Sequence, residues 1–266
     1  MAFASPTTLS DPIAERFRAL RADGRRALVC YLTAGHPDYD RSLALLRGIV
    51  DAGADIVEVG VPFSDPLADG PVIQASSQLA LERGMTFERT LDLIRDARLD
   101  CPVVLFSYLN PVLAAGPDAL TRAARAGAHG LLLTDLPLGA DPELEARFAG
   151  GPLDYVRLVA PTTPRERMAE IARHGRGFVY LISRLGVTGE RSDIAAELPA
   201  TIALLRGVTD LPVCVGFGIS RPEQAATIAR LADGVVVGSA LVRAAETGVE
   251  AATHLVRGLR AAIDAI

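Results

Sequence analysis

Short apolar runs rich in β-branched residues alternate along the chain with longer stretches in which apolar residues recur every three or four positions. The short runs are typical of strands and the longer stretches of amphipathic helices. The expected strands span Ala27–Thr33, Asp55–Gly60, Val103–Phe106, Gly130–Thr134, Tyr155–Ala160, Gly177–Ile182, Pro212–Val215 and Gly234–Val237. The expected helices span Tyr39–Asp51, Leu79 to Arg98 in two pieces around Gly84, Ala119–Ala126, Pro142–Phe148, Arg165–His174, Ile194–Arg206, Pro222–Arg230 and Val249–Ala265.

This alternation predicts right-handed βαβ units and a parallel sheet. Eight strands, each followed by a helix, is the count of a closed (β/α)₈ or TIM barrel, which typically takes about 250 residues. We therefore expect one α/β barrel domain over residues 1–266, with an extra N-terminal helix over Ser10–Ala22 and extended loops after strands 2 and 6. The competing doubly wound sheet usually has fewer strands and a glycine fingerprint after strand 1, which the sequence Thr33–Pro37 lacks.

A carboxylate, Glu58, interrupts the apolar run of the second expected strand. Alternation along a strand places Ile56, Glu58 and Gly60 on one face, and Val57 and Val59 on the other. Isolated burial of an ionised carboxylate costs on the order of several kcal/mol. Glu58 is therefore expected to be paired, to be kept protonated, or to lie at the mouth of a pocket where it does chemistry.

The loop after this strand carries Asp65 and Asp69 among proline and glycine residues. Aspartate in such a loop is most often a turn or helix-capping residue. A chemical role beside Glu58 is the alternative for either of them.

Glycines follow the sixth, seventh and eighth expected strands, where backbone N–H groups could approach an anion without obstruction. They are Gly186, Gly189, Gly216, Gly218 and Gly238. A short helix over Ser239–Ala244 would direct its N-terminus at the same place, and barrels frequently bind phosphate there. Turn geometry alone is the alternative for any one glycine, but the three loops together predict a small phosphorylated ligand.

Composition excludes several classes of protein. The net charge is −5 and the arginines are interspersed with acidic residues, so no basic patch for nucleic acid is evident. No apolar run is long enough for a transmembrane helix, and the N-terminal residues do not resemble a signal peptide. The widely spaced Cys30, Cys101 and Cys214 suggest core residues of a reduced, cytoplasmic protein. The histidines show no metal-ligand spacing, so no metal site is expected.

The chain resembles the alpha subunit of tryptophan synthase along nearly its whole length. The segment PFSDPLADGP (Pro62–Pro71), preceded by Glu58, resembles the family signature. Further similar segments are AGHP after strand 1, SYLNP (Ser107–Pro111), TDLP (Thr134–Pro137), APTTP (Ala160–Pro164), YLISRLGVTG (Tyr180–Gly189) and GFGIS (Gly216–Ser220). Leu138 and Leu185 depart from the pattern at positions where no catalytic group is expected.

The resemblance implies retro-aldol cleavage of indole-3-glycerol phosphate to indole and glyceraldehyde 3-phosphate. That reaction needs a group that gives a proton to the indole carbon and takes one from the adjacent hydroxyl, and Glu58 fits if its pKa is raised toward neutrality. The positive charge that develops on the indole nitrogen needs an anion, and Asp69 fits. By resemblance, Tyr180 points into the site; a core aromatic role is about as well supported.

The same resemblance assigns the ligand contacts. From their places at strand ends, Tyr31 and Phe106 are expected to line the pocket for the indole, although core packing explains them nearly as well, and Tyr108, just beyond strand 3, is expected to do the same. The phosphate would be held by Gly189, Gly218, Gly238 and Ser239. Thr188 would belong to a loop that closes over the ligand and contacts Asp69, which is a gating role.

A partner is also implied: a beta subunit that carries pyridoxal phosphate and takes up the indole in an alpha-beta-beta-alpha heterotetramer. No cofactor is expected in this chain. The Pro62–Pro71 loop and the loops after strands 3 and 5 would form part of the interface, with Pro62 and Asp65 as candidate contacts.

Two other classes of function remain. One is a self-sufficient enzyme, either a free-standing indole-3-glycerol phosphate lyase or another phosphosugar barrel enzyme. Several of the latter need a lysine amine, and the chain has no lysine. The other is a non-catalytic barrel that docks on a beta subunit and regulates it, against which the presence of both Glu58 and Asp69 argues.

Overall fold

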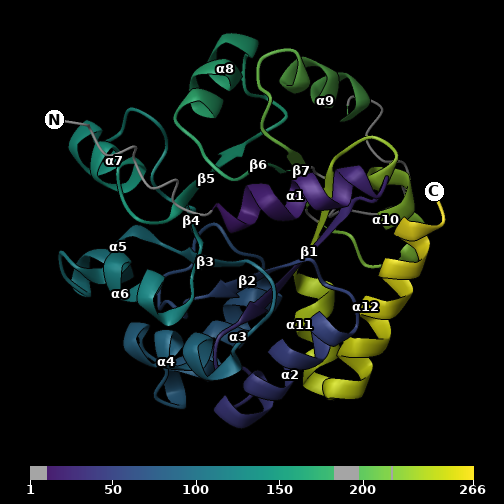
Figure 1. The fold of residues 1–266 in the computed structure, drawn as a ribbon. Helices are drawn as coiled ribbons and strands as arrows, with labels where there is room; N and C mark the ends of the chain where they lie inside the picture. Colours follow the sequence, from purple (N-terminus) through teal and green to yellow (C-terminus); the bar gives the residue numbers. More distant parts are fainter. Residues whose placement is uncertain (1–10, 183–197, 217) are drawn as a thin grey trace, which may run out of the picture.

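Eight parallel strands close into a barrel in sequence order in the computed structural model, which describes residues 11–182, 198–216 and 218–266 (Figure 1). The strands are β1 (Ala27–Thr33), β2 (Ile56–Gly60), β3 (Val103–Ser107), β4 (Gly130–Leu133), β5 (Asp154–Val159), β6 (Val179–Ile182), β7 (Val213–Gly216) and β8 (Gly234–Val237). Strand β1 pairs with both β2 and β8, which closes the ring. The expected (β/α)₈ barrel is confirmed, with strand ends shifted by at most two residues.

Helices surround the barrel (Figure 1). They are α1 (Pro12–Ala22), α2 (Tyr39–Asp51), α3 (Pro71–Glu82), α4 (Phe87–Ala97), α5 (Leu109–Ala114), α6 (Ala119–Ala126), α7 (Pro142–Ala149), α8 (Arg165–Arg173), α9 (Leu198–Arg206), α10 (Pro222–Ala229), α11 (Ser239–Thr247) and α12 (Val249–Asp264). Residues 194–197, the expected start of α9, lie outside the described residues. None of the helices in the described ranges has the length and apolar character needed to cross a bilayer.

Two helices differ from the expectation. Helix α3 begins at Pro71, eight residues before the expected Leu79, because Gly70 caps it in an extended conformation and proline suits the first helical position. The buried serines Ser76 and Ser77 interrupt the apolar pattern of this helix, so the sequence pattern did not predict its first two turns. The short helix α5 was not expected, since it is only 6 residues long.

Helix α1 covers the N-terminal end of the barrel, as Figure 1 shows. The side chain of Asp11 accepts a 2.9 Å hydrogen bond from the Ala14 N–H and caps the helix. Its apolar face is buried, and the ring of Phe17 lies 5.8 Å from that of Phe178, just before β6. The expected extra N-terminal helix is thus confirmed, and it seals one end of the barrel.

Alternate residues of the strands face the barrel interior. Near the N-terminal end these residues form one apolar cluster with the buried face of α1. Its strand members are Ala27, Val29, Ile56, Val104, Leu132, Val156, Cys214 and Val236. Two residues further along β1, β2, β3 and β5 lie Tyr31, Glu58, Phe106 and Leu158, which line a cavity. The carboxyl group of Glu58 therefore lies just beyond the apolar cluster, toward the C-terminal ends of the strands.

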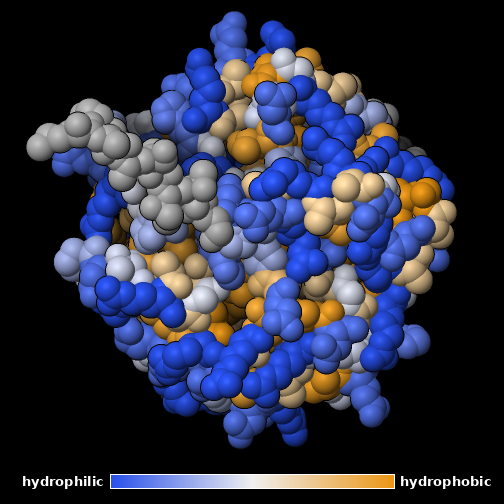
Figure 2. Space-filling view, in the orientation of Figure 1, coloured by the Kyte–Doolittle hydropathy of each residue, from blue (hydrophilic) through white to orange (hydrophobic). Residues whose placement is uncertain are grey.

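The outer surface over the α1 face is mainly hydrophilic, with apolar atoms exposed in the gaps between helices (Figure 2). A second, larger apolar cluster lies between the barrel and the helical shell and accounts for most of the buried core. The apolar residues that alternate with Glu58 on β2, Val57 and Val59, belong to that outer cluster.

Candidate active site

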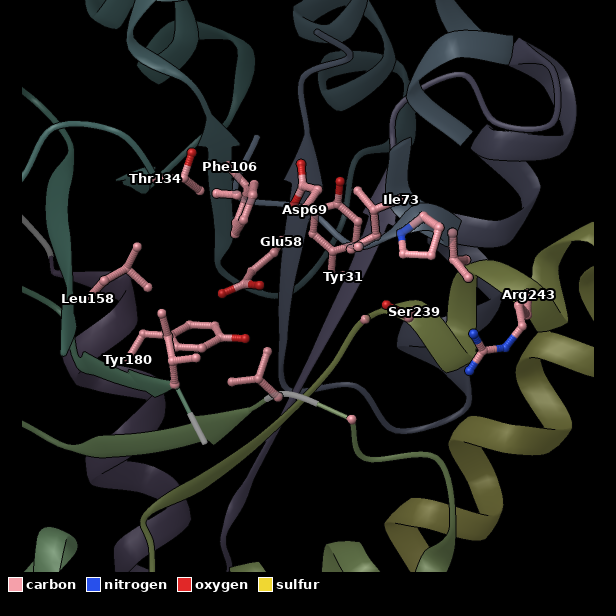
Figure 3. Close-up of a pocket in the computed structure, with 18 residues that line it drawn as sticks. Tyr31, Glu58, Asp69, Ile73, Phe106, Thr134, Leu158, Tyr180, Ser239 and Arg243 are labelled. Atoms are coloured by element: carbon pink, nitrogen blue, oxygen red, sulfur yellow. The ribbon is translucent and has the colours of Figure 1, made fainter. Parts of the chain in front are cut away.

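A cavity of about 350 Å³ opens at the C-terminal ends of the strands (Figure 3). Residues of all eight strands or the loops after them, together with the first turn of α3 and the first two turns of α11, line it. They are Tyr31, Glu58, Ala68, Asp69, Gly70, Pro71, Val72, Ile73, Phe106, Thr134, Leu158, Tyr180, Ile182, Gly218, Val236, Gly238, Ser239 and Arg243. This is the end of the fold at which barrel enzymes carry their active sites.

Glu58 lies in the wall of this cavity, between Tyr31 on β1 and Val104 on β3. Its side chain is 1% exposed, and no described residue hydrogen-bonds to Oε1. Burial raises the pKa of Glu58 to about 8, since little solvent remains to stabilise its charged form. Of the alternatives open from sequence, the structure supports a carboxyl group that is protonated at neutral pH and faces a pocket.

Asp69 lies at the end of the loop over residues 61–70 and lines the same cavity as Glu58, and Figure 3 shows it next to Tyr31. Burial raises its pKa to about 6, and a hydrogen bond from Tyr108 opposes that rise. The turn-or-cap alternative does not describe its side chain, because Gly70 is the N-cap of α3 and no side chain caps that helix. Asp69 is therefore the more acidic of two carboxyl groups on one cavity.

Three aromatic side chains form the apolar walls beside Glu58. The rings of Tyr31 and Phe106 meet edge to face at 5.0 Å. Tyr180, on β6, lies so close to β7 that a Cβ on Gly216 would come 2.5 Å from its hydroxyl oxygen. These aromatics pack in the barrel and line the cavity at once, so both sequence interpretations hold for them.

A chain of hydroxyl groups leads from the cavity wall to α3. Tyr31 Oη and Thr33 Oγ1 are 3.3 Å apart, and Thr33 Oγ1 and Ser76 Oγ are 2.7 Å apart. Ser76 Oγ in turn donates to the carbonyl of Ile73 at 2.9 Å. Strand β1 is thereby tied to the first turn of α3, directly after Asp69.

The opposite end of the cavity is formed by glycines and a helix N-terminus. Gly218 has φ +82°, which only glycine adopts without strain. Gly238 is the N-cap of α11, and Ser239 is the first residue of that helix. Gly218, Gly238 and Ser239 all line the same cavity as Glu58, as the sequence predicted. Gly189 and Thr188, the other two residues expected here, lie outside the described residues.

Sequence reasoning missed several lining residues. Leu158, Ile182 and Val236 lie on the inward face of their strands, a position that strand alternation could have indicated. Ile73 was missed because α3 begins earlier than expected. Arg243 was missed because it lies in the second turn of α11 rather than in a glycine loop.

The structure also bears on the expectations about metal sites, cysteines and partner contacts. Among the described residues no cluster could hold a metal ion, and the three cysteines are buried free thiols. Asp65 is exposed, as a partner contact would be, and it accepts a hydrogen bond from Ser64. Pro62 is buried, so its expected contact with a partner is not supported.

Comparison with known proteins gives one consistent family. The family model described as tryptophan synthase alpha chain matches residues 17–264. A tryptophan synthase alpha chain from Gluconacetobacter diazotrophicus is 50% identical over 243 residues, which is 90% of this chain and 89% of that protein. One from Desulfatibacillum aliphaticivorans is 45% identical over 241 residues, covering 90% of this chain and 91% of the relative.

Solved structures agree. Tryptophan synthase from Mycobacterium tuberculosis, in an aminoacrylate-bound form, matches with a TM-score of 0.86 and 37% identity over 96% of this chain and 100% of the other. Tryptophan synthase subunit alpha from Legionella pneumophila matches with a TM-score of 0.88 and 35% identity over 97% of this chain and 100% of the other.

Proposed function

Because the chain belongs to the tryptophan synthase alpha chain family, we propose that Glu58 and Asp69 carry out its chemistry on the cavity at the end of the barrel. The protein is a carbon–carbon lyase of tryptophan biosynthesis that cleaves indole-3-glycerol phosphate to indole and glyceraldehyde 3-phosphate. The observation that carries the assignment of residues is the protonated, buried Glu58 beside the more acidic Asp69.

Glu58 transfers the protons. Its carboxyl group donates a proton to the indole carbon that bears the glycerol chain, which turns the ring into a leaving group. The resulting carboxylate takes the proton of the adjacent hydroxyl as the C–C bond breaks, so a carbonyl forms and indole leaves. A pKa of about 8 suits a group that must give and regain a proton near neutral pH.

Asp69 stabilises the charge on the indole ring. Protonation of the ring carbon leaves positive charge on the indole nitrogen, and an ionised carboxylate near the N–H lowers the energy of that state. With a pKa of about 6, Asp69 is ionised at neutral pH while Glu58 is not. Two carboxyl groups in different surroundings thus take different roles.

The remaining lining residues position the substrate. Tyr31 and Phe106, which line the cavity, hold the indole ring, and Tyr180 packs against the reacting carbons. Tyr108, expected beside them, is not among the residues that line the cavity and reaches it through its hydrogen bond to Asp69. The phosphate lies against the backbone at Gly218, Gly238 and Ser239. Gly189 as a further phosphate ligand and Thr188 as a gating residue rest on the family likeness alone, since both lie outside the described residues. A helix N-terminus is suited to an anion, and glycine allows close approach.

The protein works with a tryptophan synthase beta subunit, which holds the pyridoxal phosphate, while the alpha chain carries no cofactor. An alpha-beta-beta-alpha heterotetramer is the proposed assembly. The loop that ends in Asp69 exposes the apolar side chain of Leu67 to 92%, and docking of a partner at this loop would cover it. Docking of the beta subunit at this loop would bring the partner into contact with the segment that carries the carboxylate of Asp69.

We place this lyase in the cytoplasm, which accords with its three buried free thiols. The organisation of residues 1–266 as one domain stays a prediction.

The test is indole release from indole-3-glycerol phosphate, with and without the beta subunit. Glu58→Gln should retain less than a few per cent of turnover while keeping the fold and the phosphate affinity. Asp69→Asn should lose roughly 10²-fold or more, as removal of an electrostatic stabiliser does. Glu166→Gln, at an exposed position of α8, is the matched control. Substantial indole release by Glu58→Gln would refute the proton-transfer assignment.

A further inference from the structure

Arg243 lies at the phosphate end of the cavity. It is in the second turn of α11, four residues after Ser239, and both residues line the cavity. Figure 3 shows its guanidinium group turned from the helix toward the cavity, on the side where Ser239 lies. The side chain is exposed, and no hydrogen bond or ion pair joins it to another described residue.

Helix geometry explains this orientation. Residues four apart share one face of a helix, and long side chains lean toward the helix N-terminus. A side chain at position 243 is therefore directed back over the first turn of α11, toward the N–H groups of Ser239 and Ala240, which precede the hydrogen bonds that Leu241 and Val242 donate to Gly238. The guanidinium and the helix N-terminus face the same place.

The charges around the cavity favour an anion at this end and nowhere else in it. Glu58 and Asp69 are the acidic groups of the wall, and Arg243 is the one basic side chain among the described lining residues. A phosphate monoester carries a charge of roughly −1.5 to −2 at neutral pH. Placed against Asp69 it would be repelled, whereas beside Arg243 it would be neutralised.

We propose that Arg243 binds the phosphate group of the substrate, as a specificity residue added to the backbone cradle at Gly218, Gly238 and Ser239. This rests on the proposed function, which supplies the phosphorylated substrate. The planar guanidinium can donate two parallel hydrogen bonds to phosphate oxygens, and such charge-assisted bonds are stronger than neutral ones. Arg243 would thus select phosphorylated over unphosphorylated indole glycerol and orient the chain toward Glu58.

The experiment compares Arg243→Gln and Arg243→Lys with the wild type, in complex with the beta subunit. Arg257→Gln is the control, since Arg257 is exposed on α12, outside the cavity, and loses the same charge. Turnover is measured on indole-3-glycerol phosphate and on unphosphorylated indole glycerol. Binding of inorganic phosphate is measured by calorimetry at two salt concentrations, which does not depend on turnover.

For Arg243→Gln we expect the KM for indole-3-glycerol phosphate and the Kd for phosphate to rise about tenfold, with kcat changed less than about twofold. The reaction with indole glycerol should be unchanged, and the lysine variant should retain part of the affinity. The salt dependence of phosphate binding should also weaken.

Phosphate affinity of Arg243→Gln equal to that of Arg257→Gln would overturn the proposal. An equal loss on both substrates would also overturn it, since Arg243 would then support the fold rather than the phosphate. If the wild type released no indole, the proposed function would fail, yet the phosphate titration would still decide the role of Arg243.

Discussion

The hydroxyl group of Tyr108 donates a 3.0 Å hydrogen bond to Oδ2 of Asp69 and accepts a 2.9 Å bond from the N–H of Ala68. Burial raises the pKa of the Tyr108 phenol well above its usual range, so the group stays protonated and remains a donor. Tyr108, the residue after β3, thus holds the loop after β2. It does so at Asp69, the carboxyl group that must be ionised in the mechanism. This bond favours the charged form of Asp69.

Replacing Tyr108 by phenylalanine removes this bond and keeps the ring. The pKa of Asp69 should then rise above about 6, by roughly one unit, since a hydrogen bond to a charged group is worth about 1.5 kcal/mol or more. Because Asp69 acts as a carboxylate, the acidic limb of the profile of kcat/KM against pH should move to higher pH. Indole release measured between pH 5 and 9 reports the shift.

Tyr39→Phe is the matched control. Tyr39 donates a 2.9 Å hydrogen bond to Asp96, at an exposed position outside the cavity. Its loss should leave the pH profile in place. If the acidic limb of the Tyr108→Phe profile also lay at its wild-type pH, Tyr108 would not influence the pKa of Asp69.

The wild-type enzyme should show a bell-shaped pH profile. Activity should fall below about pH 6, where Asp69 becomes protonated, and above about pH 8, where Glu58 loses its proton. The order of these two pKa values follows from burial, since Glu58 is more buried than Asp69. In kcat/KM the two limbs report the free enzyme.

The substrate phosphate also ionises near pH 6, so the limbs need independent assignment. Carbon NMR of labelled glutamate side chains follows Glu58 directly, and Glu58→Gln identifies its resonance. A Glu58 signal that titrates near pH 4 would contradict the alkaline limb.

Much of the site was predictable because strands alternate. The pattern of Ile56, Glu58 and Gly60 against Val57 and Val59 separated the two faces of β2, and the eight apolar runs set the order of the strands. Both are local properties of the chain. The structure then shows that the face with Glu58 is the inner one.

Contacts between distant segments were not predictable in this way. The bond from Tyr108 to Asp69 joins residues 39 positions apart, and the chain from Thr33 to Ser76 spans 43. Only the folded barrel brings the loops after neighbouring strands together. Arg243 was missed for a similar reason, since its meaning depends on which helix face meets the cavity.

Gly60→Ala should damage the cavity wall. A Cβ at this position would lie 2.2 Å from the hydroxyl oxygen of Tyr31 and 2.6 Å from its Cζ. The ring is held by burial and by Phe106, so either it or β2 must move, at a cost of about 1–3 kcal/mol. We expect a lower free energy of unfolding and a higher KM, measured by urea denaturation and indole release.

Gly258→Ala is the control for this change. Its Cβ would meet Pro222 at 3.6 Å, an ordinary contact, and alanine favours the interior of α12 by about 0.5–1 kcal/mol. The control should therefore be slightly more stable and fully active. A fully active Gly60→Ala enzyme with an unchanged KM would show that Tyr31 can move without cost.

Arg260→Met should lower the free energy of unfolding, because it breaks a buried ion pair at the start of β1 and β2. Arg260 Nη1 lies 2.8 Å from Oδ2 of Asp55, and Asp55 accepts a 2.9 Å bond from the N–H of Leu28 at the start of β1. Both side chains are buried, and burial already raises the pKa of Asp55 while Arg260 opposes that rise. Without the guanidinium an uncompensated buried carboxylate remains, which costs about 3–5 kcal/mol.

The pH dependence of this loss identifies its cause. Asp55 can escape the penalty by taking up a proton, so the destabilisation of Arg260→Met, measured by urea denaturation, should be largest near neutral pH and shrink as the pH falls. Arg95→Met, which removes an exposed pair with Asp92, is the control and should change stability little at any pH. A loss in Arg260→Met that did not vary with pH would point to the packing of the arginine stem against Gly53, rather than to the charge of Asp55.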